Sequence, residues 1–190
     1  MKKMLGIAMA SAALGLSAGT FAQAPAKLLP AQSEIAFVSK QMGVPVEGVF
    51  KKFDARISFD PKKPEGGNVA FTIDTGSASL GSAETDAELP KPEWFNALRF
   101  PLATFQSSAL KALSGGKFEV AGKLTIKGNV RDIVVPVSLT QSGGTSVASG
   151  SFTIKRLEFK IGEGEWADTS VVGNDVQVRF KLALAGLGPL

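Results

Sequence analysis

Between Ser33 and Leu184, apolar and polar residues alternate one by one in a series of short runs. Successive side chains of a β-strand point to opposite faces, so each run predicts a strand with one buried face. The most regular run, residues 118–127, places Lys127 on its polar face. About eight strands, separated by turn residues, predict an all-β fold that is either an antiparallel barrel or a sandwich. The runs cover residues 33–39, 46–60, 69–75, 103–108, 118–127, 133–139, 152–161 and 176–184.

Three of these runs contain an irregularity. In residues 46–60 the apolar positions change from even to odd numbers, and a bulge near Lys51–Lys52 would produce that change and help the sheet to curl. Pro136 has no N–H for a strand ladder, which predicts an edge strand or a bulge at that point. After Ile154 the alternation either turns Arg156 inward or passes through a second bulge.

The stretch from Ala83 to Ser107 interrupts the alternation with charges, prolines and aromatic rings. One interpretation is a short capped helix, with Pro90 and Pro92 in its first turn and with Trp94 and Phe95 plugging one end of the core. The other is a lid whose rings line the mouth of an apolar cavity. The sequence leaves both interpretations open.

The first 22 residues have the order of a secretory signal peptide: two lysines, an apolar run and then small residues. We expect cleavage after Ala22, because cleavage after Ala24 would place Pro25 behind the scissile bond. The alternative is an uncleaved anchor, but the apolar run is short for a bilayer span. The expected mature domain, residues 23–190, is therefore periplasmic.

Composition removes several classes of function. The chain has no cysteine and no histidine, which excludes disulfides, thiol catalysis, Ser-His-acid triads and imidazole metal sites. The formal net charge is only +4, too small to indicate a nucleic-acid-binding protein. An enzyme of this composition would have to use carboxylates, and the sequence has two clusters of acidic residues that could do so. Charged runs beside loops are, however, usually exposed to solvent. These clusters are Glu84, Asp86 and Glu88, and Glu163, Glu165 and Asp168.

Several short motifs, in this order and spacing, resemble the YceI-like, polyisoprenoid-binding family over residues 33–184. They are Ser33-x-Ile35-x-Phe37, Val46-x-Gly48-x-Phe50-x-x-Phe53, Asp86-x-Glu88-Leu89, Trp94-Phe95, Phe100-Pro101-x-x-x-Phe105 and Val120-x-Gly122-x-Leu124-Thr125-Ile126-x-Gly128. The family often has a histidine after its first strand and another in the Asp-x-x-Leu element. This chain has Lys40-Gln41 and Glu88 there, so any head-group contact made by those histidines is absent.

The resemblance implies an exported, eight-stranded antiparallel lipocalin-like barrel with a short helical lid segment. It implies a non-enzymatic periplasmic protein that encloses a long-chain polyisoprenoid or isoprenoid-quinone lipid, with no other cofactor and no nucleic-acid partner. Transient contact with a membrane surface and a homodimer are both compatible with that function. The alternative is a stress-response or interaction module whose interior is packed and carries no lipid.

Thirteen residues are expected to contact the lipid, most of them apolar and inward-facing in the strand pattern. The chain has 13 phenylalanines and no tyrosine, so the interior rings bring no hydroxyl that needs a partner. If Arg156 points inward it could bind a pyrophosphate or quinone oxygen, or it could pair with Glu158 or Asp168 at the rim. The thirteen are Phe37, Phe50, Phe53, Phe59, Phe71, Ile73, Trp94, Phe95, Phe105, Leu124, Ile126, Arg156 and Trp166.

Overall fold

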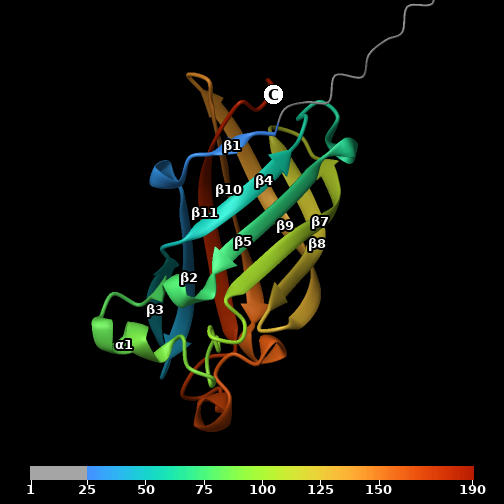
Figure 1. Cartoon of the computed structure of the whole chain (residues 1–190). Coiled ribbons are helices and arrows are strands. Elements are labelled where there is room, and N and C mark those ends of the chain that lie inside the picture. Colours follow the sequence, from blue (N-terminus) through green and yellow to red (C-terminus); the bar gives the residue numbers. More distant parts are fainter. Residues whose placement is uncertain (1–24) are drawn as a thin grey trace, which may run out of the picture.

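The computed structural model describes residues 25–190 (Figure 1). The expected signal peptide, residues 1–22, and its candidate cleavage points after Ala22 and Ala24 lie outside the described residues. Among residues 25–190, no helix combines the length and the apolar character needed to cross a bilayer.

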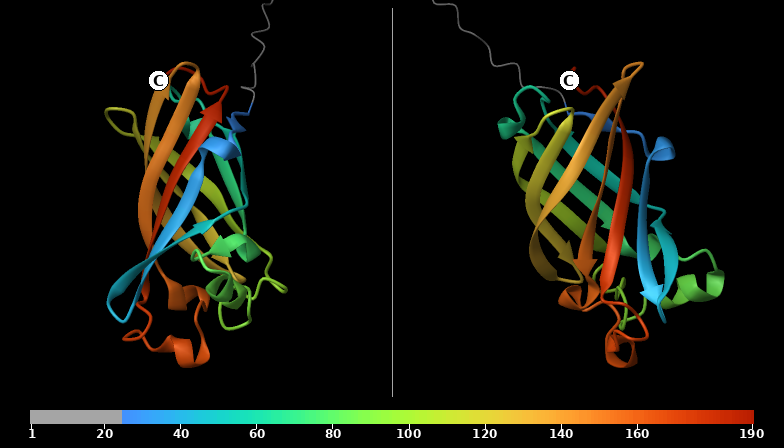
Figure 2. Two further views of the ribbon diagram at one scale, coloured as in Figure 1. Left: turned by 90° about the vertical axis from the view of Figure 1, so that its left-hand side faces the viewer. Right: turned by 180° about the vertical axis from the view of Figure 1, so that it is seen from behind.

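One antiparallel sheet of eleven strands curls around the hydrophobic core (Figures 1 and 2). Along the sheet the strands follow the order β4-β5-β7-β8-β9-β10-β11-β2-β3-β6, and β1 pairs with β11 beside this path. The strands are β1 (Lys27–Leu28), β2 (Glu34–Gln41), β3 (Val44–Phe50), β4 (Phe53–Ser58), β5 (Asn68–Asp74), β6 (Ala78–Ser79), β7 (Leu102–Ala112), β8 (Lys117–Ile126), β9 (Asn129–Ser142), β10 (Thr145–Lys155) and β11 (Asp175–Ala185). The all-β, lipocalin-like prediction is confirmed, with eleven strands in place of eight.

Helical segments are short and lie between strands. Within residues 25–190 the one α-helix is α1 (Ala83–Glu88), and the 3₁₀ helices are η1 (Pro30–Gln32), η2 (Pro64–Gly66), η3 (Thr75–Ser77), η4 (Arg156–Phe159) and η5 (Gly164–Ala167). In Figure 1, α1, η4 and η5 lie at the lower end of the curled sheet, and β1 and the C-terminus lie at the upper end. We use "upper" and "lower" in this sense throughout.

Residues 46–60 form two strands instead of one bulged strand. The expected change of phase is present, because Gly48 is buried on β3 and Ile57 on β4. The chain breaks at Lys51–Lys52, where the N–H groups of both lysines donate to Ser77. β3 therefore pairs with β2 while β4 pairs with β5, and the bulge prediction is wrong.

The short strand β1 helps to close the upper end. Leu28 pairs with Leu184 on β11, and the N–H of Ala26 donates to the carbonyl of Ile57 on β4 over 2.7 Å. A segment that pairs with the interior strand β11 thus also reaches β4, which lies at one end of the sheet order (Figure 2). A run of two residues is too short to give a periodic signal in the sequence.

Pro136 lies in an interior strand, so the prediction of an edge strand is wrong. β9 lies between β8 and β10, and its register with β8 passes through Glu119↔Pro136 without a bulge. Its ladder to β10, however, stops at Ser138↔Ser149. The missing N–H therefore interrupts no pairing, because Pro136 lies beyond the end of the β9–β10 ladder.

Candidate functional site

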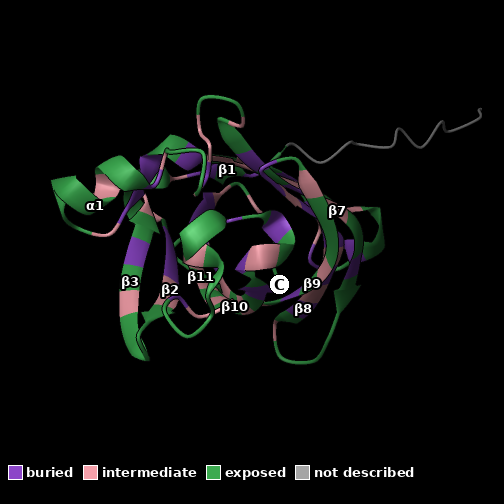
Figure 3. Ribbon diagram, turned by 90° about the horizontal axis from the view of Figure 1, so that it is seen from below, coloured by how far each residue is buried: buried purple, intermediate pink, exposed green. Residues whose placement is uncertain are grey.

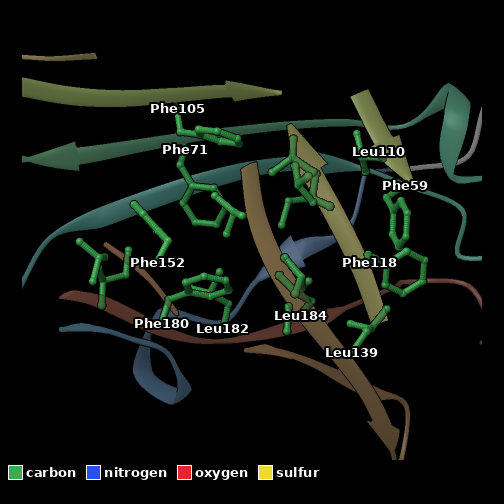
Figure 4. A pocket seen from close by; sticks show the side chains of 18 of the residues that line it. Phe59, Phe71, Phe105, Leu110, Phe118, Leu139, Phe152, Phe180, Leu182 and Leu184 are labelled. Atoms are coloured by element: carbon green, nitrogen blue, oxygen red, sulfur yellow. The ribbon is translucent and has the colours of Figure 1, made fainter. Parts of the chain in front are cut away.

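The interior of the curled sheet contains two cavities. The upper cavity has a volume of about 150 Å³ and only apolar lining residues, several of which are labelled in Figure 4. Its lining is Ile35, Ile57, Phe59, Val69, Phe71, Ile73, Phe105, Leu110, Phe118, Val120, Leu124, Val135, Val137, Leu139, Ala148, Phe152, Val178, Phe180, Leu182, Leu184 and Leu187.

The lower cavity is larger, with a volume of about 440 Å³. It is mostly apolar and contains the two tryptophans of the chain. Its lining is Phe37, Ser39, Gln41, Met42, Phe50, Ile73, Leu80, Thr85, Glu88, Leu89, Trp94, Phe95, Ala103, Leu124, Ile126, Phe152, Ile154, Arg156, Ile161, Trp166, Val171, Val172, Val176 and Val178. Four side chains line both cavities, and we call them the boundary residues: Ile73, Leu124, Phe152 and Val178.

The lower cavity reaches the surface between three segments. Its exposed lining residues are Gln41 and Met42 at the tip of the β2–β3 hairpin, Thr85 and Glu88 on α1, and Val171 in the loop before β11. The hairpin and this loop are joined by a hydrogen bond of 2.8 Å from the Met42 N–H to the Val171 carbonyl. Figure 3 shows this end from below, with exposed residues around the rim. We call this opening the mouth.

Twelve of the thirteen residues expected to contact a lipid line a cavity. Phe59, Phe71 and Phe105 line the upper one, and Ile73 and Leu124 line both. Phe53 lines neither and packs against the core. The other seven line the lower cavity: Phe37, Phe50, Trp94, Phe95, Ile126, Arg156 and Trp166.

The sequence interpretation missed several lining residues on β8, β10 and β11. Phe118, Phe152 and Phe180 each continue an alternating run, so the strand pattern itself could have identified them. Leu187 follows the last strand, and no periodic signal marks it.

Three of the lining rings lie directly over glycines of a neighbouring strand. Phe37 covers Gly48, Phe105 covers Gly122 and Phe180 covers Gly150, and a Cβ added to any of these glycines would meet the ring at less than van der Waals distance. Rings seated on glycine stay flat against the wall of the sheet and take little space from the interior. These pairs therefore help to keep the cavities open.

Several aromatic rings line the lower cavity and pack against one another. The centroids of Phe37 and Phe50 are 5.3 Å apart, and Phe50 meets Phe95 edge-on at 5.8 Å. Trp94 and Trp166 approach each other at 5.5 Å. These separations are typical of favourable tilted and edge-to-face ring pairs.

The stretch 83–107 combines features of both interpretations. α1 begins after Ser82, whose hydroxyl accepts a hydrogen bond from the Thr85 N–H, and it ends at Glu88. Pro90 therefore follows the helix, so the expectation of prolines in its first turn is wrong. Leu89, Trp94 and Phe95 line the lower cavity, as the lid interpretation required.

Arg156 points inward but pairs with no carboxylate. Its side chain continues the inward face of Ile154 and is only 1% exposed. Burial lowers the pKa of the guanidinium, which stays charged. Its five N–H groups donate to five backbone carbonyls, at 2.6–3.0 Å, so the expected pairing with Glu158 or Asp168 is wrong. The five acceptors are Gly173, Ile161, Gly162, Trp166 and Val172.

Lys127 is a second buried cation at this end. The alternation placed it in solvent, but its side chain is only 5% exposed, so that expectation is wrong. Its ammonium group donates to the carbonyls of Pro92 and Lys160 and to the carboxylate of Glu163. Lys127 and Arg156 thus fix the loops below the cavity and have their donors occupied.

In each of the two acidic clusters, one carboxylate is held by hydrogen bonds from neighbouring residues. The Asp86 carboxylate accepts hydrogen bonds from the Ser79 hydroxyl, the Leu80 N–H and Lys51, and the Ser79 bond is the main reason that its pKa is lowered. Asp168 accepts from Ser170, which lowers the pKa of that carboxyl group. In residues 25–190, no group of three or more candidate ligand residues could hold a metal ion.

The YceI-like domain model matches residues 27–184, nearly the whole of the described structure. The chain belongs to the YceI-like family. Protein YceI of Salmonella arizonae is 32% identical over 146 residues, which cover 75% of this chain and 74% of that protein.

Three solved structures are similar to this chain in fold. BcnA of Burkholderia cenocepacia is 44% identical, with a TM-score of 0.80 over 83% of this chain and 99% of that one. The YceI protein of Campylobacter jejuni is 25% identical, with a TM-score of 0.66 over 73% of this chain and 83% of that one. A polyisoprenoid-binding domain from Saccharophagus degradans has 18% identity, a TM-score of 0.68 and coverage of 85% and 98%, which indicates a shared fold.

Proposed function

We propose that this protein encloses the prenyl chain of an isoprenoid lipid, such as a quinone, and carries or stores it without chemical change. The observation that carries the proposal is the pair of adjoining, mostly apolar cavities, the larger of which has a mouth at the lower end. A packed interior, as the interaction-module alternative required, would leave no such space. The shared fold of the polyisoprenoid-binding domain supports the same function.

An apolar interior of this kind suits a hydrocarbon chain. Each methylene-sized group that leaves water for such a cavity contributes about 0.8 kcal/mol, so a prenyl chain can bind tightly without a polar array. Twenty-one residues line the upper cavity, and none of them has a polar side chain. Chain shape and length, more than hydrogen bonds, then decide which lipid fits.

The head group that this site suits best is uncharged. Arg156 is the one cationic side chain among the residues that line the lower cavity, and its N–H groups are all used by backbone carbonyls. At the mouth, the Lys91 ammonium group bonds to both carboxylate oxygens of Glu88, at 2.6 and 2.7 Å, so the two charges largely cancel. Ser39 and Gln41 offer a hydroxyl and an amide to a neutral oxygen. We therefore favour a quinone or alcohol over a prenyl phosphate.

Quinone binding is expected to quench the tryptophan fluorescence. Trp94 and Trp166 both line the lower cavity, so a quinone ring held near the mouth lies close to both indoles. A short-chain ubiquinone should give saturable quenching at one molecule per protein. Menadione, which has a quinone ring and no prenyl chain, should quench weakly and without saturation. Equal behaviour of the two compounds would contradict a site that recognises the chain.

The proposed place of action is the periplasm, and the proposed source of the ligand is a membrane surface. Apolar residues are exposed beside the mouth: Met42 is 79% exposed, and Val44 follows it on β3. Apolar side chains at a rim can enter the boundary region of a bilayer. A lipid could then pass into the lower cavity without crossing open water.

The variant Val44→Glu is expected to slow transfer of ubiquinone from vesicles to the protein about fivefold to tenfold, because a charge disfavours contact between the rim and the bilayer. Val44 lines neither cavity, so the equilibrium Kd should stay unchanged. Val134→Glu is the matched control, since Val134 is 58% exposed on β9 and also lines neither cavity. Stopped-flow fluorescence measures the transfer, and equal rates for the two variants would contradict membrane contact at the mouth.

A further inference from the structure

The two cavities differ in size and in the polarity of their lining. The lower one, about 440 Å³, contains polar side chains and exposed residues at its mouth, whereas the upper one, about 150 Å³, is apolar throughout. The boundary residues lie between them. A chain that enters at the mouth therefore fills the lower cavity first and reaches the upper cavity only after passing the boundary.

The far end of the upper cavity is occupied by rings and by the segment after β11. Phe59 and Phe118 meet edge-on with centroids 5.1 Å apart, at the end opposite Phe152 in Figure 4. Leu187 lines the cavity, and the Gln141 amide bonds to the Gly188 carbonyl and the Leu190 N–H that follow it. These contacts limit how far a chain can extend.

We infer that the upper cavity makes the affinity of the protein for a lipid depend on the length of the prenyl chain. The inference rests on the proposed function and adds a selection rule to it. Short prenyl chains occupy the lower cavity alone, whereas longer chains place their distal end in the upper cavity and gain affinity from each further buried carbon. Affinity stops rising when the chain end reaches Phe59 and Phe118. The protein thereby prefers lipids whose chains pass the boundary residues.

Two buried alanines allow a matched test of this inference. Ala148 on β10 lines only the upper cavity, and Ala103 on β7 lines only the lower one. Replacement by leucine adds the same volume to each cavity, beside existing empty space. Ala148→Leu therefore removes space from the distal end of a chain, and Ala103→Leu removes space from the part nearest the mouth.

The experiment measures Kd by tryptophan quenching for ubiquinones with short, intermediate and long prenyl chains. Ala148→Leu should raise the Kd of the long-chain quinone about tenfold or more, because several carbons of the chain can no longer be buried. The Kd of the short-chain quinone should stay within about twofold of its value for the unaltered protein. Ala103→Leu should raise both Kd values. Thermal unfolding checks that each variant folds, and Val137→Leu, which also adds volume to the upper cavity, replaces Ala148→Leu if that protein is unfolded.

The outcomes separate this inference from the proposed function. If the unaltered protein binds no ubiquinone of any chain length, the proposed function is wrong, and so is the inference that affinity depends on chain length. If quinones bind, but the upper-cavity variant weakens the binding of short-chain and long-chain quinones equally, or leaves the binding of long-chain quinones unchanged, the proposed function stands. The inference about chain length is then overturned. A selective loss of long-chain binding supports both.

Discussion

Replacing Arg156 by methionine is expected to destabilise the protein by about 3–5 kcal/mol, which corresponds to a fall in melting temperature of roughly 10 °C. Methionine fills much of the same space but donates no hydrogen bond, so five carbonyl groups lose their shared donor. A buried carbonyl left without a partner costs much more than an exposed one. Thermal unfolding followed by circular dichroism measures the change.

The same substitution is expected to weaken lipid retention, because the carbonyls that Arg156 holds belong to a loop that lines the lower cavity. Ile161, Trp166 and Val172 are at once its hydrogen-bond acceptors and lining residues. Loss of their shared donor should loosen this side of the cavity and speed the release of a bound quinone.

Two further variants show whether the hydrogen bonds themselves are responsible. Arg156→Lys should recover part of the stability, since an ammonium group can replace at most three of the five donors. Arg56→Met is the control, because Arg56 is exposed on β4 and surface substitutions usually change stability by less than about 0.5 kcal/mol. A melting temperature of Arg156→Met equal to that of the control would show that the guanidinium does not hold the loop.

The curled sheet could be predicted because its main strands are long and each has one buried face. The alternation in β8 and β11, and in β7 as far as Ser107, gives the direction of the side chains from local sequence alone, whereas a register shift between Ser107 and Ala109 brings Leu110 to the buried face. The count of strands fell short because β1 and β6 have two residues each and because the chain changes partner at Lys51–Lys52. Such features depend on contacts with distant segments, which periodicity does not report.

The polar parts of the site were less predictable for a different reason. Arg156 and Lys127 bond mainly to backbone carbonyls, which every residue has, so no side-chain type in the sequence reveals their partners. Lys127 lies in the tight turn between β8 and β9, with a φ of 49°, where a lysine would ordinarily reach into water. The tertiary arrangement of the loops overrides that expectation.

The open interior also depends on relations between strands. Phe37 and Gly48 stand opposite each other in the register of β2 and β3, and Phe180 and Gly150 do so in β11 and β10. Considered one residue at a time, the sequence predicts only that a glycine weakens its strand and that a phenylalanine packs in a core. Only the cross-strand pairing shows that together they leave space, because the ring lies where the absent side chain would have been.

Gly48→Ala tests this arrangement, and we expect it to weaken binding of every isoprenoid quinone by about tenfold or more. The added Cβ would lie 2.7 and 2.8 Å from two carbons of the Phe37 ring and closer still to a third, so the ring must swing away from the wall. Phe50 already packs against Phe37 at 5.3 Å, which leaves the lower cavity as the free direction. Overpacking of this kind also costs about 1–3 kcal/mol of stability.

The control for this prediction is Gly66→Ala, because nothing lies within 4 Å of an added Cβ there and its φ is outside the left-handed region. The double variant Gly48→Ala with Phe37→Leu should regain most of the affinity, since leucine has no ring to displace, and fluorescence titration measures the complete double-mutant cycle. If Gly48→Ala binds quinones as tightly as the control, the Phe37 ring does not set the volume of the lower cavity. If the double variant binds no better than Gly48→Ala alone, the loss of affinity comes from a distorted strand and not from the Phe37 ring. A loss caused by the displaced ring would be reversed when Phe37→Leu removes that ring.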